Sequence, residues 1–354
     1  MATLRSRKYR SATKYLFREE QADAIVRTTA YHRKDFPLSV ISFFPREHVP
    51  IRSSIATPFQ QPTSNTTVLG SLDRLPLELW HDVLLRLDMH SLFRFRQTSI
   101  RSREIVDSLH EYRMVTSHGL NLLCALLRTR VATHVSLSDF YHALCTKDCP
   151  LCGEFGGFIS LLTWQRCCFN CLRRAPETQV QTLAAVRRQF HLTRAESRQL
   201  RSFRTLPGTY SMEETSYKSR ISIVSARQAM LAFGQRPHDI APARPASWRR
   251  NERFKFAGSC ALPYYDKRTG KVEHGVSCAG CQLARERKII GSTSSEWGFE
   301  ARDKVYAQDG FLNHFRWCEQ AQVLWKLSGE GNQRPMEMPF AAWTGGFFTS
   351  RYQA

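Results

Sequence analysis

Four cysteines in the middle of the chain occur as two Cys-x-x-Cys pairs. Cys149 and Cys152 form the first pair, and Cys168 and Cys171 follow sixteen positions after Cys152. Each such turn directs two thiolates at one centre, and two turns complete the tetrahedron that Zn²⁺ prefers. Gly153 lets the chain turn away where a side chain would clash. Four protein ligands leave no open coordination position, so the pattern predicts a structural zinc site and not a catalytic one.

Two neighbouring cysteines complicate this ligand set. Cys167 stands beside Cys168 and is an alternative ligand, although only Cys168 gives the Cys-x-x-Cys spacing with Cys171. Cys145 lies four residues before Cys149, and we expect it to be a buried thiol at a helix end. A redox site is the competing interpretation, but it needs one Cys-x-x-Cys at a helix start and not two matched pairs.

A second ligand set lies in the last hundred residues. Cys278 and Cys281 form a third Cys-x-x-Cys, and His314 and Cys318 are four apart in a predicted helix over 310–327, hence on one face. Segments 260–265 and 272–277 are expected to pair as a hairpin before the cysteines. Hairpin, turn and helix predict a Cys₃His zinc site of treble-clef type. The alternative is that His314 is a surface histidine and Cys318 a core thiol.

Positive charge concentrates between these two ligand sets. Residues 173–255 contain 17 Lys and Arg against 6 Asp and Glu, and the whole chain carries a net charge of +20. A predicted helix from Thr193 would place four arginines on one face, at positions 194, 198, 201 and 204. Such a stripe can bind phosphates or an acidic protein, or simply be a solvated helix face. Few aromatic residues interleave with it, which argues against single-stranded nucleic acid.

The helices expected ahead of the first cysteines begin at residue 71. Apolar residues at Leu79, Val83, Leu84 and Leu87 follow one side of a first helix, which Pro76 suits as an opening residue. A second helix is expected from position 91 and a third from position 99 or 102. Three such short helices leave more apolar side chains than one inner seam needs, so some are expected to face the rest of the chain or a partner.

This stretch resembles an F-box, the adaptor-binding module of SCF-type ubiquitin ligases. The family pattern is matched by Leu75-Pro76-Leu77-Glu78-Leu79, Val83-Leu84, Leu87, Ser91-Leu92 and Arg101. The chain departs from it at Thr98-Ser99, where the family has Val-Cys, and at Ser102, where the family has an aromatic residue. The resemblance implies docking on a Skp-type adaptor through Leu75, Pro76, Leu79, Val83, Leu84 and Leu92. The alternative is an ordinary amphipathic helix pair in a core.

With the two cysteine blocks, residues 72–330 are similar to filamentous-fungal F-box proteins with Cys-rich C-terminal regions. That likeness implies no catalytic residue and names no target.

Composition sets the remaining bounds. A chain of 354 residues with 42% hydrophobic residues can bury a real core, and no apolar run is long enough to span a membrane. Eleven cysteines without a secretory leader indicate a reducing compartment, so a cytoplasmic or nuclear location is expected. The basic N-terminal stretch resembles a mitochondrial presequence in charge, but its apolar spacing is poor and acidic residues follow at 19, 20 and 23.

These patterns predict a mainly α fold with small β-hairpins: a three-helix F-box, then an α+β domain stabilised by one or two structural zinc sites. The expected divisions are a disordered basic arm and linker (1–70), the F-box (71–117), a helical region with the first metal site (118–235), a loop (236–256), a hairpin–helix region with the second site (257–330) and a flexible tail (331–354).

The function expected from these features is that of a substrate receptor in an SCF-type ubiquitin ligase, without catalysis of its own. The partners would be a Skp-type adaptor with its cullin scaffold and a protein substrate. The alternative is a zinc-containing basic protein that binds nucleic acid or chromatin. GxSxG, HExxH, P-loop and dinucleotide-binding fingerprints do not occur in the sequence.

Overall fold

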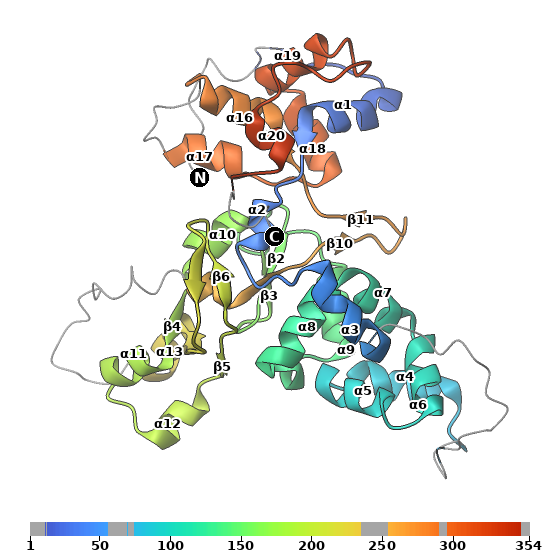
Figure 1. Ribbon diagram of the computed structural model, residues 1–354, viewed down its shortest axis with the longest axis vertical. Coiled ribbons are helices and arrows are strands. Elements are labelled where there is room, and N and C mark those ends of the chain that lie inside the picture. Colours follow the sequence, from blue (N-terminus) through green and yellow to red (C-terminus); the bar gives the residue numbers. More distant parts are fainter. Residues whose placement is uncertain are drawn as a thin grey trace.

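The computed structural model describes residues 11, 13–55, 69, 74–234, 254–289 and 296–347. It is mainly helical with small antiparallel sheets, as predicted. The chain forms three lobes around a central three-stranded sheet (Figure 1). None of the described helices is both long and apolar enough to cross a membrane.

The helical lobe contains the F-box stretch and the helices that follow it. Its helices are α4 (Leu77–Arg86), α5 (Met89–Arg96), α6 (Ile100–Ser108), α7 (His110–His118), α8 (Leu120–Thr129) and α9 (Leu137–Leu144), with η3 (Val131–His134) between the last two. Helix α4 packs on α6 and α9, and α5 packs on α6, α8 and η3. The first three helices therefore bury their inner sides against the rest of the lobe, as their surplus of apolar residues predicted.

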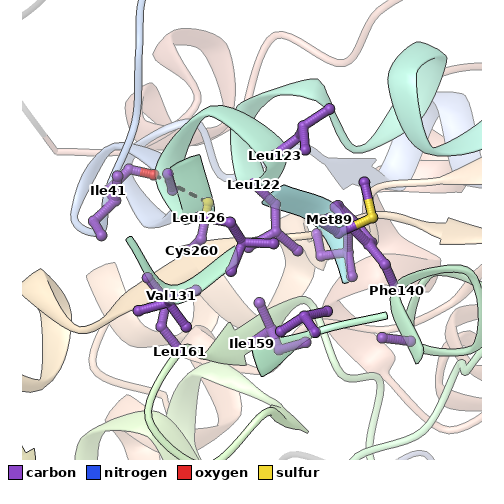
Figure 2. Close-up of a cluster of buried hydrophobic side chains, with 14 of the residues drawn as sticks. Ile41, Met89, Leu122, Leu123, Leu126, Val131, Phe140, Ile159, Leu161 and Cys260 are labelled. Atoms are coloured by element: carbon purple, nitrogen blue, oxygen red, sulfur yellow. Dashed lines mark hydrogen bonds between the residues drawn. The ribbon is translucent and has the colours of Figure 1, made fainter. Parts of the chain in front are cut away.

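The central sheet joins this lobe to the cysteine-rich parts of the chain. Strands β2 (Phe158–Ser160), β3 (Gln165–Cys167) and β9 (Ser259–Ala261) pair in the order β3-β2-β9. Figure 2 shows how the core continues from the helices into this sheet: Leu122 and Leu126 of α8 lie near Ile159 and Cys260. The Cys260 thiol donates to the carbonyl of Ile41 at 3.3 Å, which ties the N-terminal segment to the same core.

A second sheet organises the lobe at the lower left of Figure 1. Strands β4 (Val180–Thr182), β5 (Ser202–Arg204) and β8 (Ser222–Ser225) pair in the order β4-β8-β5. Helices α11 (Leu183–Gln189), α12 (Arg194–Gln199) and α13 (Ala226–Phe233) accompany it, and β6 (Gly208–Tyr210) and β7 (Thr215–Tyr217) form a hairpin. Helices α10 (Phe169–Arg174) and α15 (Phe254–Ala257) connect this lobe to the central sheet.

The upper lobe combines segments from opposite ends of the described chain. This lobe contains helices α16 (Ala279–Glu286), α17 (Glu296–Asp303), α18 (Gln308–Phe315), α19 (Glu319–Leu327) and α20 (Phe340–Thr344), and α1 (Ala22–Thr29) packs on α18 and α19. Strand β1 (Ala30–Tyr31) pairs with β12 (Ser277–Cys278), and the short hairpin of β10 (Tyr264–Tyr265) and β11 (Val272–Glu273) leads into it. Figure 1 shows the blue α1 among the orange and red helices.

The N-terminal segment is therefore not a disordered arm over residues 13–55, and that prediction is wrong there. Ile25 of α1 is fully buried in the upper lobe, α2 (Asp35–Leu38) lies at the centre, and α3 (Pro45–Ile55) packs on the helical lobe. The Tyr112 hydroxyl donates to the carbonyl of Ile55 at 2.6 Å. The partners of its apolar residues lie far away in sequence, from Tyr112 beside Ile55 to Phe311 and Trp325 around Ile25, so no local pattern reveals them.

The predicted flexible tail is likewise docked as far as residue 347. The carbonyl of Gly345 accepts from the Lys34 backbone N–H at 2.6 Å, and the Phe347 N–H donates to Asp35 at 3.2 Å. The loop predicted at 236–256 lies outside the described residues up to position 253, after which α15 begins.

Candidate docking face and metal centres

Helix α4 presents two different sides. Trp80 and Leu84 are four residues apart and lie in the core, where Trp80 stacks on Phe95 with ring centroids 5.3 Å apart. Leu79 and Val83 each precede one of these residues by one position, so they point about 100° away from them. Their exposed fractions are 53% and 49%.

Two further aliphatic residues are exposed at the start of the helix. Leu75 is 40% exposed and Leu77 is 46% exposed, and Pro76 between them is exposed as well. We call Leu75, Leu77, Leu79 and Val83 the docking face. Leu77, Leu79 and Val83 belong to α4 and Leu75 lies two residues before it, so four large aliphatic side chains are at least 40% exposed within nine positions.

The structure separates the six predicted adaptor-binding residues into two groups. Leu75, Pro76, Leu79 and Val83 lie on the surface, whereas Leu84 and Leu92 are fully buried and cannot contact a partner in this conformation. The interpretation of those two as contact residues is therefore corrected: they hold α4 and α5 against the core. Leu77 was not predicted, and periodicity gave no signal for it: it stands seven positions before the buried Leu84 and so on nearly the same side of the helix, yet it is 46% exposed.

The two departures from the family pattern have a structural role. Ser99 caps α6, its side chain accepting from the Ser102 backbone N–H at 3.0 Å, while the Ser102 side chain accepts from the Ser99 N–H at 3.0 Å. These two serines form a reciprocal capping box that fixes the start of the third helix. Arg96 of α5 holds the same helix by a bidentate pair with Asp107, at 2.7 and 3.0 Å.

The first four cysteines come together as the spacing predicted. Cys149 and Cys152 lie on a tight turn in which the Cys149 carbonyl accepts from the Gly153 N–H at 2.8 Å, and Gly153 has a φ of +75° that favours glycine. Cys168 caps α10, which carries Cys171 in its first turn. A turn, the β2–β3 hairpin and a helix thus bring four sulfurs within 4.8 Å of one another.

The sulfur spacing fits a tetrahedral metal ion. Cys152 Sγ and Cys168 Sγ are 3.5 Å apart, and all described cysteines are free thiols. Zn–S bonds of about 2.3 Å at tetrahedral angles place two sulfurs about 3.8 Å apart, whereas a disulfide needs about 2.05 Å. The donor set is soft and complete, so a bound zinc ion would link the turn to the helix and leave no position for a substrate.

Thiol acidities at this cluster show why it suits a cation. A hydrogen bond from Cys168 lowers the pKa of Cys149 to about 5, although burial opposes the shift. Bonding to Cys149, with burial, raises the pKa of Cys168, and burial raises that of Cys171 to about 12. Ionisation of one thiol therefore makes ionisation of its neighbours less favourable. A divalent ion bound by all four thiolates would remove this electrostatic cost.

The alternative ligand Cys167 lies outside the cluster. It sits on β3 opposite Phe158, is fully buried, and burial raises its pKa well above the ordinary value. Successive residues of a strand point to opposite faces, so Cys167 and its neighbour Cys168 cannot face the same centre. Cys145 is half-buried at the end of α9, as expected of a helix-end thiol.

The second set of four residues also converges. Cys278 caps α16 and Cys281 lies in its first turn, while His314 is near the end of α18 and Cys318 caps α19. Cys278 Sγ and Cys318 Sγ are 3.7 Å apart, and Cys281 Sγ lies 3.3 Å from His314 Nε2. The four donors lie within 4.8 Å of one another, a Cys₃His set that fits zinc by the same criteria.

This second centre holds two helices in close contact. A Cβ added at Gly280 would lie 2.2 Å from the backbone nitrogen of Ala321, so only glycine allows α16 to approach α19 here. Burial raises the pKa of Cys278 and of Cys281. Burial also opposes ionisation of Cys318, but hydrogen bonds from both thiols outweigh it and lower the Cys318 pKa.

Two details of this region differ from the predictions. The expected helix over 310–327 is broken at 316–318 into α18 and α19, and the break places both ligands at helix ends. The predicted hairpin has only β10 and β11 paired, because β9 joins the central sheet and β12 pairs with β1. At the first centre a cysteine turn, the β2–β3 hairpin and a helix supply and connect the ligands, whereas the second centre lies where α16, α18 and α19 meet end to end.

The predicted arginine stripe does not form. Helix α12 ends at Gln199, and the chain then enters β5, so Arg201 lies between the two elements and Arg204 on the strand. Arg201 is half-buried, and burial lowers its pKa. Arg194 and Arg198 remain as exposed residues of one helical turn, which removes the main structural support for nucleic-acid binding.

Comparison with known proteins identifies one domain in the chain. The family model of the F-box domain matches residues 72–114, from just before α4 into α7. No curated protein and no solved structure matches the chain. The likeness of residues 72–330 to fungal proteins therefore stays a prediction. The match, together with the three helices and their exposed aliphatic side, shows that the chain carries an F-box domain at residues 72–114.

Proposed function

We propose that this chain is the substrate-receptor subunit of an SCF-type ubiquitin ligase. It binds a Skp-type adaptor through the docking face and presents the remaining lobes to a target protein. The observation that supports this most strongly is the F-box domain with four aliphatic residues exposed in α4 and just before it. The chain makes no bonds itself; it raises the concentration of a target near the transfer machinery.

We further propose one structural zinc ion at each cysteine cluster. The first would be held by Cys149, Cys152, Cys168 and Cys171, and the second by Cys278, Cys281, His314 and Cys318. Both sets are complete, so the ions would stabilise the target-side lobes and would not activate water. Such thiolate sites require a reducing compartment, which supports a cytoplasmic or nuclear location.

Adaptor binding is tested by Leu79→Asp combined with Val83→Asp. Burial of a large aliphatic side chain contributes about 1.5–3 kcal/mol, so losing two of them and burying two carboxylates weakens adaptor binding at least about a hundredfold. The measurement is co-purification with a Skp-type adaptor, followed by titration. Both residues are about half exposed, so the variant stays folded, whereas substitution of the buried Leu84 would unfold the lobe.

The matched control is Leu231→Asp combined with Leu327→Asp. These leucines are 74% and 45% exposed on helices of the other lobes, and their replacement leaves adaptor binding unchanged. A folded docking-face variant that still co-purifies with the adaptor would rule out the proposed role of α4.

A further inference from the structure

A cavity of about 430 Å³ lies where the lobes meet. Its wall comes from the N-terminal segment around α2, the junction of α7 and α8, the start of β2, the chain between β9 and β10, and the loop before β12. These elements surround the centre of Figure 1. A volume of this size lies within the usual range for small-ligand sites and is large enough to hold one large side chain.

The inner wall of the cavity is mostly apolar. Its large apolar residues are Phe36, Pro37, Phe43, Leu122, Phe158, Leu262, Pro263 and Val305. Such a wall favours a leucine, phenylalanine or tryptophan side chain, each of which gains about 1.5–3 kcal/mol when removed from water.

Among the residues that the structure describes, the polar ones of the wall are basic or neutral, and none of them is acidic. Lys34 is exposed, and partial desolvation of their rings lowers the pKa of His274 and of His118. At neutral pH these imidazoles are therefore uncharged hydrogen-bonding groups, and Lys34 supplies a full positive charge.

A second source of positive charge lies directly behind Lys34. Arg33 lines the cavity and pairs with Asp35 at 2.7 Å and with Asp303 at 3.1 Å, while Arg302 and Arg173 also contact Asp303, at 2.7 and 3.4 Å. Three guanidinium groups against two carboxylates leave this group one positive charge in excess. An anionic group at the mouth of the cavity is attracted by both sources.

The three histidines of the cavity do not form a metal site. His32 Nδ1 is engaged with the carbonyl of Gly275 at 2.8 Å, and the His118 ring stacks on Tyr265 with centroids 5.7 Å apart. Within the described residues, the only groups of potential ligands close enough for a metal are the two cysteine clusters.

The cavity and the docking face use different parts of the chain. No lining residue falls within the F-box match at 72–114, and the nearest lining residue, His118, lies at the end of α7. An adaptor on α4 and a ligand in the cavity can therefore be bound together.

We infer that this cavity binds an acidic segment of the target protein, which inserts one large apolar side chain while its carboxylates face Lys34. This inference rests on the proposed function, since it identifies the recognition site of the receptor. The apolar wall contributes affinity and the positive mouth selects for acidic flanks.

The test uses fluorescent heptapeptides with one central Leu, Phe or Trp flanked by Asp and Glu, compared with the same peptides flanked by Lys. The full chain binds the acidic set, with saturation below about 1 mM, and binds the Lys-flanked set at least about tenfold more weakly. Lys34→Glu weakens binding of the acidic set about tenfold and improves binding of the Lys-flanked set, because the charge at the mouth is reversed.

Ala261→Phe provides an independent variant. Ala261 is half-buried in the cavity wall, and a phenyl group there occupies the space that the peptide side chain needs, so peptide binding falls about tenfold whatever the flanks. Lys218→Glu is the control: this exposed lysine lies outside the wall, and its replacement leaves peptide affinity unchanged.

The inference is overturned if no peptide binds below about 1 mM, if acidic and Lys-flanked peptides bind alike, or if both cavity variants bind as the wild type does. Adaptor co-purification and zinc content are measured on the same variants and stay unchanged. Adaptor binding by the docking-face variant tests only the proposed function, and peptide binding by the cavity variants tests only this inference. Failure of one can therefore be told apart from failure of the other.

Discussion

The Arg33 guanidinium is buried where three segments far apart in sequence meet. It forms two hydrogen bonds with Asp35, at 2.8 and 2.7 Å, and stacks over Phe36 with its central carbon 3.8 Å from the ring centroid. Asp303 at the end of α17 completes the arrangement. The bidentate geometry offsets the cost of removing these charges from water, and loss of one partner would leave the others unpaired.

Replacement of Asp303 by Asn exposes this dependence on charge. Burial raises the pKa of Asp303, but Arg302 and Arg33 outweigh that effect and hold it below the ordinary 3.8. Because the folded pKa is depressed, the stabilisation is fully present above the unfolded pKa and is lost as the pH falls through the folded value. At pH 7 we expect Asp303→Asn to lower the free energy of unfolding by about 3 kcal/mol.

Urea unfolding of the variant and the wild type at several pH values checks this. The difference in free energy of unfolding between the variant and the wild type stays constant from pH 7 to 5, and it narrows only below about pH 4. Asp82→Asn is the control, since Asp82 and its partner Arg86 are both mostly exposed and their pair contributes little. A difference that has vanished by pH 5 would contradict this account.

Individual elements were predictable where their signals are local. The capping box of Ser136 and Asp139 places the start of α9, and the structure has this helix at Leu137–Leu144 as expected. The same device correctly starts α12 at Thr193, but that helix stops after six residues because the next residues pair with β8. Pairing between strands about twenty residues apart produces no periodic pattern in the local sequence. The prediction that the helix carries all four arginines on one face was therefore wrong.

The same difference between local and long-range signals applies to the candidate sites. Cys-x-x-Cys spacing brings its own ligands together, and the structure brings all eight predicted metal ligands into two clusters. Periodicity alone did not distinguish the core side of α4 from its outer side: Leu84 was predicted as a contact residue and is buried, while Leu77 was missed and is exposed. The apolar residues of α4 that are left exposed are determined by how α9 packs against α4. This is a tertiary contact that the local sequence does not reveal.

Removal of one cysteine turn tests the first metal centre. Elemental analysis of the purified chain is expected to give two zinc ions, and Cys149→Ser combined with Cys152→Ser leaves one, because two remaining thiolates cannot hold the ion. Cys145→Ser is the control and retains two, since this half-buried thiol lies outside the cluster. A folded chain without zinc would contradict both centres.

At the scale of the whole molecule, residues 13–55 act as a brace across the lobes. Strand β1 joins the upper lobe, the backbone of Ile41 bonds to Ser259 of the central sheet at 3.0 Å, and the carbonyl of Ser54 accepts from Arg96 at 2.7 Å. The orientation of the docking face relative to the other lobes is therefore set by this segment and not only by the direct chain connections.

Ile25→Asp tests the brace at its upper end. Ile25 is fully buried beside the second metal centre, and a carboxylate there costs about 3–5 kcal/mol, so the upper lobe loosens. One of two zinc ions is then released to a chelator faster, while adaptor binding through α4 is unchanged. Leu16→Asp, at a position 80% exposed, leaves both release rates as in the wild type. Equal release rates in Ile25→Asp would show that α1 does not support the metal centre.

The pairing of β1 with β12 also fixes an order of events during synthesis. Residues 22–31 leave the ribosome early, yet the helices and metal ligands they pack against do not exist until residues 277–327 have been translated. Helices α4 to α9, whose mutual contacts lie within residues 77–144, can associate before then, so the chain would offer its docking face while the upper lobe is still open. Until translation passes those residues, the apolar side of α1 that contains Ile25 has no packing partner among these helices and stays open to solvent.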